Sequence, residues 1–186
     1  MFSLNEKVVY PGYGVARISR ILVKKTGQSS TNFFELSFLS KPVTILVPVD
    51  NALLVGIRRL GTRESVDTVF KNLAEMVVPT VNVHSIDAST VNWNKRNKEY
   101  QGKMRTGNLQ EICEIYRDLK AIEHGKGLSF GEKTLLAQTE TLLAEEIAIV
   151  YNTDEKGAME RLSTLIRGIP QQCSTKDPAL FGQPER

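Results

Sequence analysis

The hydrophobic pattern of this chain changes near residue 60. Before Leu60, short runs of β-branched and aromatic residues alternate with turn residues, as in β-strands. From Ser65 onward the apolar residues recur at spacings of three and four, the period of an α-helix. This change predicts an α+β chain of two domains, a β-domain followed by a helical one. The 186 residues are enough for two small domains.

Five short strands are predicted before residue 60, over residues 7–10, 15–25, 32–38, 43–49 and 55–59. Glycines at 12 and 14 predict a tight turn, residues 27–32 a polar hairpin loop and residues 40–42 a short turn. Pro48 has no N–H to donate, which places it at a strand end or an edge. Because full closure removes exposed edges, five short strands favour a small closed or nearly closed barrel of the Tudor-like or SH3-like kind.

The second part predicts a compact, all-α bundle. The apolar residues that form helical stripes are Val66, Val69, Phe70, Leu73, Leu109, Ile112, Cys113, Tyr116, Leu119, Ile122, Leu135, Leu136, Leu142, Leu143, Ile147, Val150, Ala158, Leu162, Leu165 and Ile166. Between the first two stripes, Pro79 ends a helix, residues 80–91 form an irregular connection, and residues 92–103 form a polar, basic helix.

Capping signals mark the ends of the later helices. Ser129 and Glu132 have the spacing of a capping box, Asp154 is a candidate N-cap, and Gly125 and Gly127 end the helix before them. After Pro170 the composition is polar and rich in helix breakers, which predicts disorder. The expected domains are therefore residues 1–62 and 63–170, followed by a tail over 171–186.

Composition argues for a cytoplasmic protein without a cofactor. The net charge of +3 permits an anionic partner but does not require one. Cys113 and Cys173 suggest neither a disulfide framework nor a metal site, and Cys113 is expected in the core. The first ten residues have no signal-peptide pattern, and no apolar run is long enough to span a membrane. We expect no enzyme and no small-molecule substrate, because no nucleophile–base pair, phosphate-binding loop or metal-ligand spacing is present.

A basic segment contains the only tryptophan of the chain. Its candidate nucleic-acid contacts are Trp93, Asn94, Lys95, Arg96 and Lys98. Lysine and arginine neutralise backbone phosphates without reading the sequence, and a neighbouring aromatic ring can wedge or stack at an opened base step. Alternatively, Trp93 anchors its helix to the next one and the basic residues form a solvated face.

A second candidate surface lies in the predicted barrel. The segment Thr44, Ile45, Leu46 and Val47 has apolar residues at alternating and adjacent positions. A strand that is apolar on both faces is either fully buried or pairs with a partner at its edge. Burial of one face by the helical domain is an equally plausible explanation.

Four blocks of this sequence resemble CarD/CdnL-type bacterial transcription factors. They are residues 7–15 (KVVYPGYGV), 44–58 with TILVPVDNA followed by VGIR, 92–96 (NWNKR) and 127–133 (GLSFGEK). They occur in the order of the family pattern and extend over most of residues 3–167. Each block alone is weak, and the four together are specific.

For the first domain, the resemblance implies a Tudor-like barrel that is also the polymerase-interaction module of the transcription-repair coupling factor. In the family this barrel lays a strand edge against the β subunit of RNA polymerase. The matching strand here is Thr44 to Val47, with Lys24 and Lys25 as candidate charged contacts on the neighbouring strand. Some members have a basic residue where this chain has Leu46, so the contact expected here is apolar.

For the second domain, the resemblance implies contact with promoter DNA. In the family a tryptophan meets the minor groove at the upstream edge of the melted bubble and slows its collapse, without sequence specificity. That residue corresponds to Trp93, with Lys95, Arg96 and Lys98 as its phosphate-contacting neighbours. The expected location is the cytoplasm, on the nucleoid through RNA polymerase. The alternative is a protein–protein adaptor that binds polymerase and a second protein without touching DNA.

Overall fold

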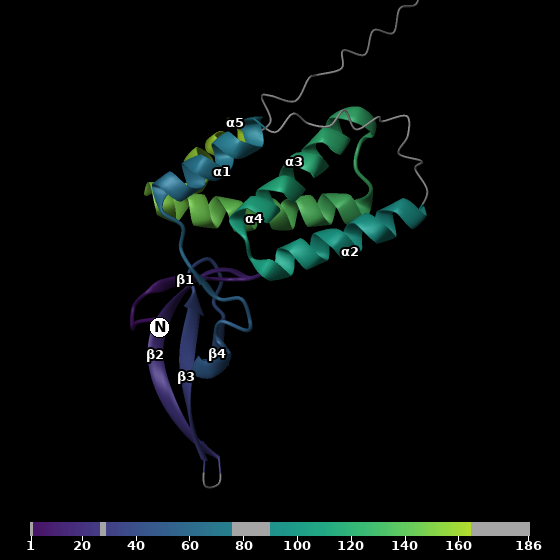
Figure 1. Cartoon of the computed structure of the whole chain (residues 1–186). Helices are drawn as coiled ribbons and strands as arrows, with labels where there is room; N and C mark the ends of the chain where they lie inside the picture. The colour runs from purple at the N-terminus through teal and green to yellow at the C-terminus, as the bar shows by residue number, and fades with distance from the viewer. Residues whose placement is uncertain (1, 27–28, 76–89, 165–186) are drawn as a thin grey trace, which may run out of the picture.

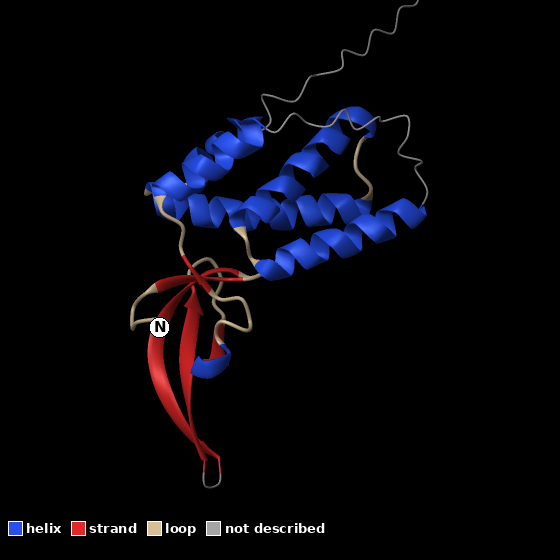
Figure 2. Ribbon diagram, in the orientation of Figure 1, coloured by secondary structure: helices blue, strands red, loops and turns tan. Residues whose placement is uncertain are grey.

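The computed structural model describes residues 2–26, 29–75 and 90–164, as an antiparallel sheet followed by helices (Figures 1 and 2). The elements of the sheet domain are β1 (Lys7–Tyr10), β2 (Gly14–Thr26), β3 (Ser29–Phe38), β4 (Thr44–Pro48), the 3-10 helix η1 (Val49–Asn51) and β5 (Arg58–Arg59). The helices are α1 (Arg63–Glu75), α2 (Thr90–Thr106), α3 (Leu109–Lys126), α4 (Phe130–Tyr151) and α5 (Glu155–Thr164). The predicted α+β architecture is confirmed.

The strands lie in the order β4-β3-β2-β1-β5, and every neighbouring pair is antiparallel. β2 and β3 form the long hairpin that extends away from the helices in Figure 2. Their register is interrupted once, between Ile18 and Arg20, by an irregularity of the bulge type. β4 ends the sheet on one side, with Leu36 paired to Ile45 and Phe34 to Val47. The strand proposed to meet a partner is therefore an edge strand.

Two separate hydrophobic cores are formed, one in the sheet and one among the helices. The buried residues of the sheet core are Val8, Ala16, Ile18, Phe34, Leu36, Phe38, Val47, Ala52 and Ile57. The helical core is built around fully buried side chains that include Leu73, Ile115, Tyr116, Leu119, Leu143, Ile147 and Leu162. Cys113 lies in this core, as predicted. Each part thus buries its own apolar surface.

The predicted caps of α4 and α5 are confirmed. The Ser129 hydroxyl accepts from the Glu132 N–H at 3.4 Å, and the Glu132 carboxylate accepts from the Ser129 N–H at 2.9 Å. Asp154 caps α5 by accepting from the Gly157 N–H at 2.8 Å. Gly127 follows α3 with a φ of +79°. Local capping in the sequence therefore determines where α4 begins.

Several predicted boundaries are wrong. The loop predicted over residues 27–32 is shorter, because β2 continues to Thr26 and β3 begins at Ser29, where cross-strand pairing outweighs the polar composition. The strand predicted over 55–59 shrinks to Arg58–Arg59, because Val55 and Gly56 form turns whose N–H groups bond to Asn51 and Leu53. α2 is longer than predicted. Pro79, most of the 80–91 connection, Leu165, Ile166 and the 171–186 tail lie outside the described residues.

Among the described residues, no helix combines the length and apolar character that crossing a membrane requires.

Candidate polymerase and nucleic-acid interfaces

The tryptophan of the basic segment lies against the start of α4. A Cβ added to Gly131 would lie 3.0 Å from Cζ2 of Trp93, so the ring rests on a position where the helix has no side chain. Trp93 is partly buried and packs on the helical core. The ring is therefore both an anchor between α2 and α4 and a partly accessible aromatic surface.

Arg96 lies one turn along α2 and binds the same end of α4. Its Nη2 lies 2.6 Å from Oε1 of Glu132, whose side chain is 5% exposed. Glu132 is also the capping-box carboxylate, and its Oε2 accepts from the Ser129 hydroxyl at 2.7 Å. The ion pair with Arg96 and the hydrogen bonds of the cap thus meet at one buried carboxylate. They fix the start of α4 relative to the α2 segment that carries Trp93.

The other predicted DNA contacts do not share a face with Trp93. Asn94, Lys95 and Lys98 are exposed, whereas Trp93, Arg96 and the buried Tyr100 lie three or four residues apart on the side of α2 that faces α4 and the core. Neither Lys95 nor Lys98 forms an ion pair with another described residue. The structure therefore places Trp93 with Arg96, and Lys95 with Lys98 on the solvent side.

Burial raises the pKa of two tyrosines of this bundle. Burial raises the pKa of Tyr100 to about 12, with the Asp118 carboxylate adding to the shift and Arg96 opposing it. Burial also raises the pKa of Tyr116 to about 12. These hydroxyls are packing groups at physiological pH and contribute no charge to the surface.

In the sheet domain, the predicted polymerase-contact residues alternate along β4. Val47 is buried, Ile45 is partly buried against the sheet core, and Thr44 and Leu46 are exposed. Lys24 and Lys25 are exposed on β2. One expectation is corrected here: the strand beside β4 is β3, so both lysines lie one strand further away. Lys24 pairs with Thr31, beyond the Phe33–Pro48 pair at which β4 ends.

The sheet and the helices are joined by an ion pair whose carboxylate is buried, and the sequence analysis did not predict this pair. Arg58 of β5 donates from Nη1 and Nη2 to the two carboxylate oxygens of Glu146 in α4, both at 2.7 Å. Arg58 Nε donates to the Gly107 carbonyl at 2.6 Å. Glu146 is 3% exposed. Each hydrogen bond adds to a contact that holds β5, α4 and the α2–α3 turn together.

Glu145, which precedes Glu146 in α4, makes a second contact between the helices and the sheet, at strand β2. Glu145 Oε2 accepts from the backbone N–H of Val15 at 3.2 Å. Gly14 makes this approach possible, because it has a φ of +109° and any Cβ there would collide with the Glu145 carboxylate. The beginning of β2 and the end of α4 are thus in direct contact.

Helix α4 therefore links both candidate surfaces (Figure 1). Its first turn holds Trp93 and Arg96, and Glu145 and Glu146 near its other end hold the sheet. Glu132 and Glu146 are 14 residues apart, which corresponds to roughly 21 Å along the helix. The apolar stripe of α4 is interrupted every seven residues by a buried polar residue, namely Glu132, Thr139 and Glu146. This spacing is the one sequence signal that the two carboxylates are buried and therefore need partners.

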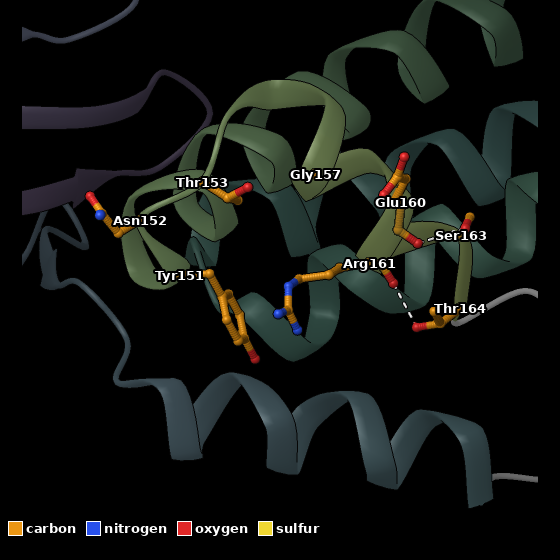
Figure 3. Close-up of a pocket in the computed structure, with 8 residues that line it drawn as sticks. All are labelled: Tyr151, Asn152, Thr153, Gly157, Glu160, Arg161, Ser163 and Thr164. Carbon is orange, nitrogen blue, oxygen red and sulfur yellow. Dashed lines mark hydrogen bonds between the residues drawn. The ribbon is translucent and has the colours of Figure 1, made fainter.

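A surface hollow at the α4–α5 turn is separate from these residues. It is lined by Tyr151, Asn152, Thr153, Gly157, Glu160, Arg161, Ser163 and Thr164 (Figure 3). The Arg161 guanidinium lies 4.0 Å from the centroid of the Tyr151 ring, and the Tyr151 hydroxyl donates to Asp67. None of the predicted contact residues lines this hollow. Its groups pack the last helix onto the bundle.

The comparisons with known proteins match both parts of the chain in order. The profile described as "CarD-like/TRCF RID domain", the RNA polymerase interaction domain, matches residues 2–61. The profile described as "CarD, C-terminal domain" matches residues 78–163. The chain belongs to the CarD family.

The individual relatives share less than a third of their aligned residues with this chain. The chain is 25% identical over 156 residues to "Putative transcription factor YdeB" of Bacillus subtilis (strain 168). The aligned region covers 84% of this chain and 96% of that protein. It is similar to the solution NMR structure of the 72-residue N-terminal domain of Myxococcus xanthus CarD, with 29% identity, a TM-score of 0.28, and coverage of 32% of this chain and 79% of that one. The match to YdeB extends through both domains.

Proposed function

We propose that this CarD-family protein is a transcription regulator that binds the β subunit of RNA polymerase and stabilises the open promoter complex. The sheet domain binds polymerase, and the helical domain contacts the minor groove at the upstream edge of the bubble without reading sequence. The role is regulatory rather than catalytic. The protein acts in the cytoplasm, on the nucleoid through polymerase, without a cofactor.

The observation that carries this proposal is the link through α4. The Arg58–Glu146 pair fixes the sheet to one end of α4, and the other end holds Trp93. A sheet domain docked on polymerase therefore presents Trp93 at a defined distance and raises its effective concentration at promoter DNA. Lys95 and Lys98 then contact phosphates through weak, salt-sensitive pairs. Arg96 acts mainly by orienting Trp93 through Glu132.

The distribution of apolar surface supports assigning polymerase to the sheet domain. Ten of the eleven large apolar side chains described as exposed precede Gly56, and Leu46 of β4 is among them. Exposed apolar surface favours protein contacts. An edge strand offers unpaired backbone groups to a partner strand. Thr44 and Leu46 are the exposed β4 side chains that would lie against the β subunit.

The polymerase contact is tested by replacing Leu46 with glutamate and measuring capture of the isolated β subunit. Leu46 is 36% exposed, so the variant should fold, and a charge on the docking face should weaken capture at least tenfold. Leu4→Glu is the matched control, because Leu4 is 54% exposed and lies outside the edge strand. Equal capture by both variants would argue against docking through β4.

The DNA contact is tested by the lifetime of open complexes at a ribosomal-RNA promoter, with polymerase from the same organism. The wild-type protein should lengthen this lifetime, and the Lys95→Ala, Lys98→Ala double variant should shorten it and reduce the salt dependence. Lys71→Ala, Lys156→Ala is the matched control, since both lysines are exposed on other helices. Trp93→Ala should abolish the increase in open-complex lifetime. Trp93→Phe is the accompanying variant that keeps an aromatic ring in the core packing.

A protein–protein adaptor is the second candidate, and the internal contacts of Trp93 and Arg96 favour it. Both side chains pack within the bundle and are only partly exposed. In that function the helical domain binds a second protein, and the basic face of α2 is solvated. If the protein captures polymerase but does not change the open-complex lifetime, the adaptor function is favoured over DNA contact.

A further inference from the structure

Phe130 is the most exposed large apolar side chain that the structure describes, at 87%, and the only one of that set on a helix. Single exposed apolar residues are common and need no function. The position of Phe130 sets it apart, because it is the first residue of α4 and directly precedes Gly131, on which Trp93 rests.

Folding does not require the Phe130 ring. The apolar residue that anchors the start of α4 is Leu128, which precedes the cap and packs against the helical core. The cap itself is formed by Ser129 and Glu132. An alanine at the first helical position has at least as good a helix propensity as phenylalanine. Phe130 thus contributes little to the bundle and remains available to a partner.

The surroundings of Phe130 are suited to an anionic partner. Lys133 and Thr134 lie three and four residues further along α4, on the same exposed face. Glu132 is the only carboxylate between residues 127 and 139, and it is buried and paired with Arg96. The positive end of the helix dipole adds to the charge of Lys133. A ring beside a lysine and the positive end of a helix, in a segment (residues 127–139) without an exposed carboxylate, suits a nucleic acid better than an apolar protein pocket.

We infer that Phe130 is a second aromatic contact to promoter DNA, beside Trp93, and that its ring inserts at or stacks on an unstacked base step at the edge of the bubble. This inference rests on the proposed function. Phenylalanine is among the apolar side chains that wedge between base steps, and stacking tolerates any sequence because every base has a π-face. Phe130 supplies the protruding ring, whereas Trp93 is held back by its packing on Gly131 and the core.

The first test measures the lifetime of competitor-challenged open complexes with the full chain as wild type, Phe130→Ala, Phe130→Tyr and Phe130→Leu. Phe130→Ala should keep its melting temperature and lose five- to tenfold of the lifetime that the wild type adds. Phe130→Tyr should retain the effect, and Phe130→Leu should retain only part of it. An alanine variant as effective as the wild type would overturn the inference while the proposed function stands.

The second test identifies the partner directly. A photo-crosslinking benzoylphenylalanine at position 130 should crosslink to promoter DNA just upstream of the bubble in the polymerase complex. Crosslinks only to a polymerase subunit, or none to DNA in a complex that contains the protein, would overturn the inference. If the wild-type protein does not lengthen the open-complex lifetime, the proposed function fails. The crosslink then still decides whether Phe130 contacts DNA.

Discussion

Arg58 and Glu146, 88 residues apart in sequence, form a bidentate ion pair with both N···O distances at 2.7 Å. The pair joins β5 of the sheet to α4 of the helical bundle. Because Glu146 is buried, its charge depends on this partner for compensation. The relative orientation of the two domains, and hence of the two proposed interfaces, depends on this contact.

Loss of Arg58 should destabilise the protein. In Arg58→Ala, a buried carboxylate remains without its partner, which typically costs about 3 kcal/mol or more in the free energy of unfolding. The measurement is urea denaturation followed by far-UV circular dichroism. Arg59→Ala is the matched control, because Arg59 is 66% exposed where it pairs with Glu6. Its expected cost is below about 1 kcal/mol. Equal costs would contradict the bracing role of Arg58.

Two glycine-to-alanine variants should behave differently. Gly102 lies within α2 with nothing within 4 Å of an added Cβ, so Gly102→Ala should stabilise the protein by about 0.5–1 kcal/mol. In Gly131→Ala the new methyl group displaces Trp93, which removes that gain and shifts the tryptophan emission maximum. Trp93 is the only tryptophan, so the emission is assigned without ambiguity. An unchanged emission in Gly131→Ala would mean that the ring does not rest on Gly131.

Stability should fall at alkaline pH because of Tyr100 and Tyr116. Burial raises the pKa of each to about 12 in the folded protein, from a usual value of 10.0. Their contribution is fully present below pH 10 and is lost as the pH rises toward 12, because the unfolded chain releases these protons first. Urea denaturation at pH 9 to 11.5 measures the slope. The Tyr100→Phe, Tyr116→Phe double variant should have a flatter pH dependence, and an equal slope would exclude these tyrosines as the cause.

Cys113 should be unreactive in the folded protein. It is fully buried, and this burial raises the pKa of its thiol, so the reactive thiolate is not formed at neutral pH. In a Cys173→Ser background, a thiol reagent such as dithionitrobenzoate should release no colour until urea is added. The midpoint of the reactivity should coincide with the unfolding midpoint. Rapid labelling of the native variant would indicate local opening of the helical core.

The organisation along the chain could be read from the sequence because it depends on local interactions. The change of period near residue 60 separates strands from helices, and Ser129 with Glu132 marks the start of α4 from four consecutive residues. The boundaries failed where pairing with a distant strand decided the outcome. Ser29 to Asn32 have a loop-like composition but pair with β2. Residues 55–56 of the expected strand form a turn.

The candidate site was predicted residue by residue, but its geometry was not. Residues close in sequence, such as Trp93 and Lys95, lie on different sides of α2, because a helix turns by about 100° per residue. The partners of Arg96 and Arg58 are 36 and 88 residues away, and a periodic pattern does not identify partners at such distances in the sequence. The sequence alone thus determined the elements, their order and the family. Only the tertiary structure paired Glu132 with Arg96 and Glu146 with Arg58, because burial of these charges depends on side chains that the fold brings together.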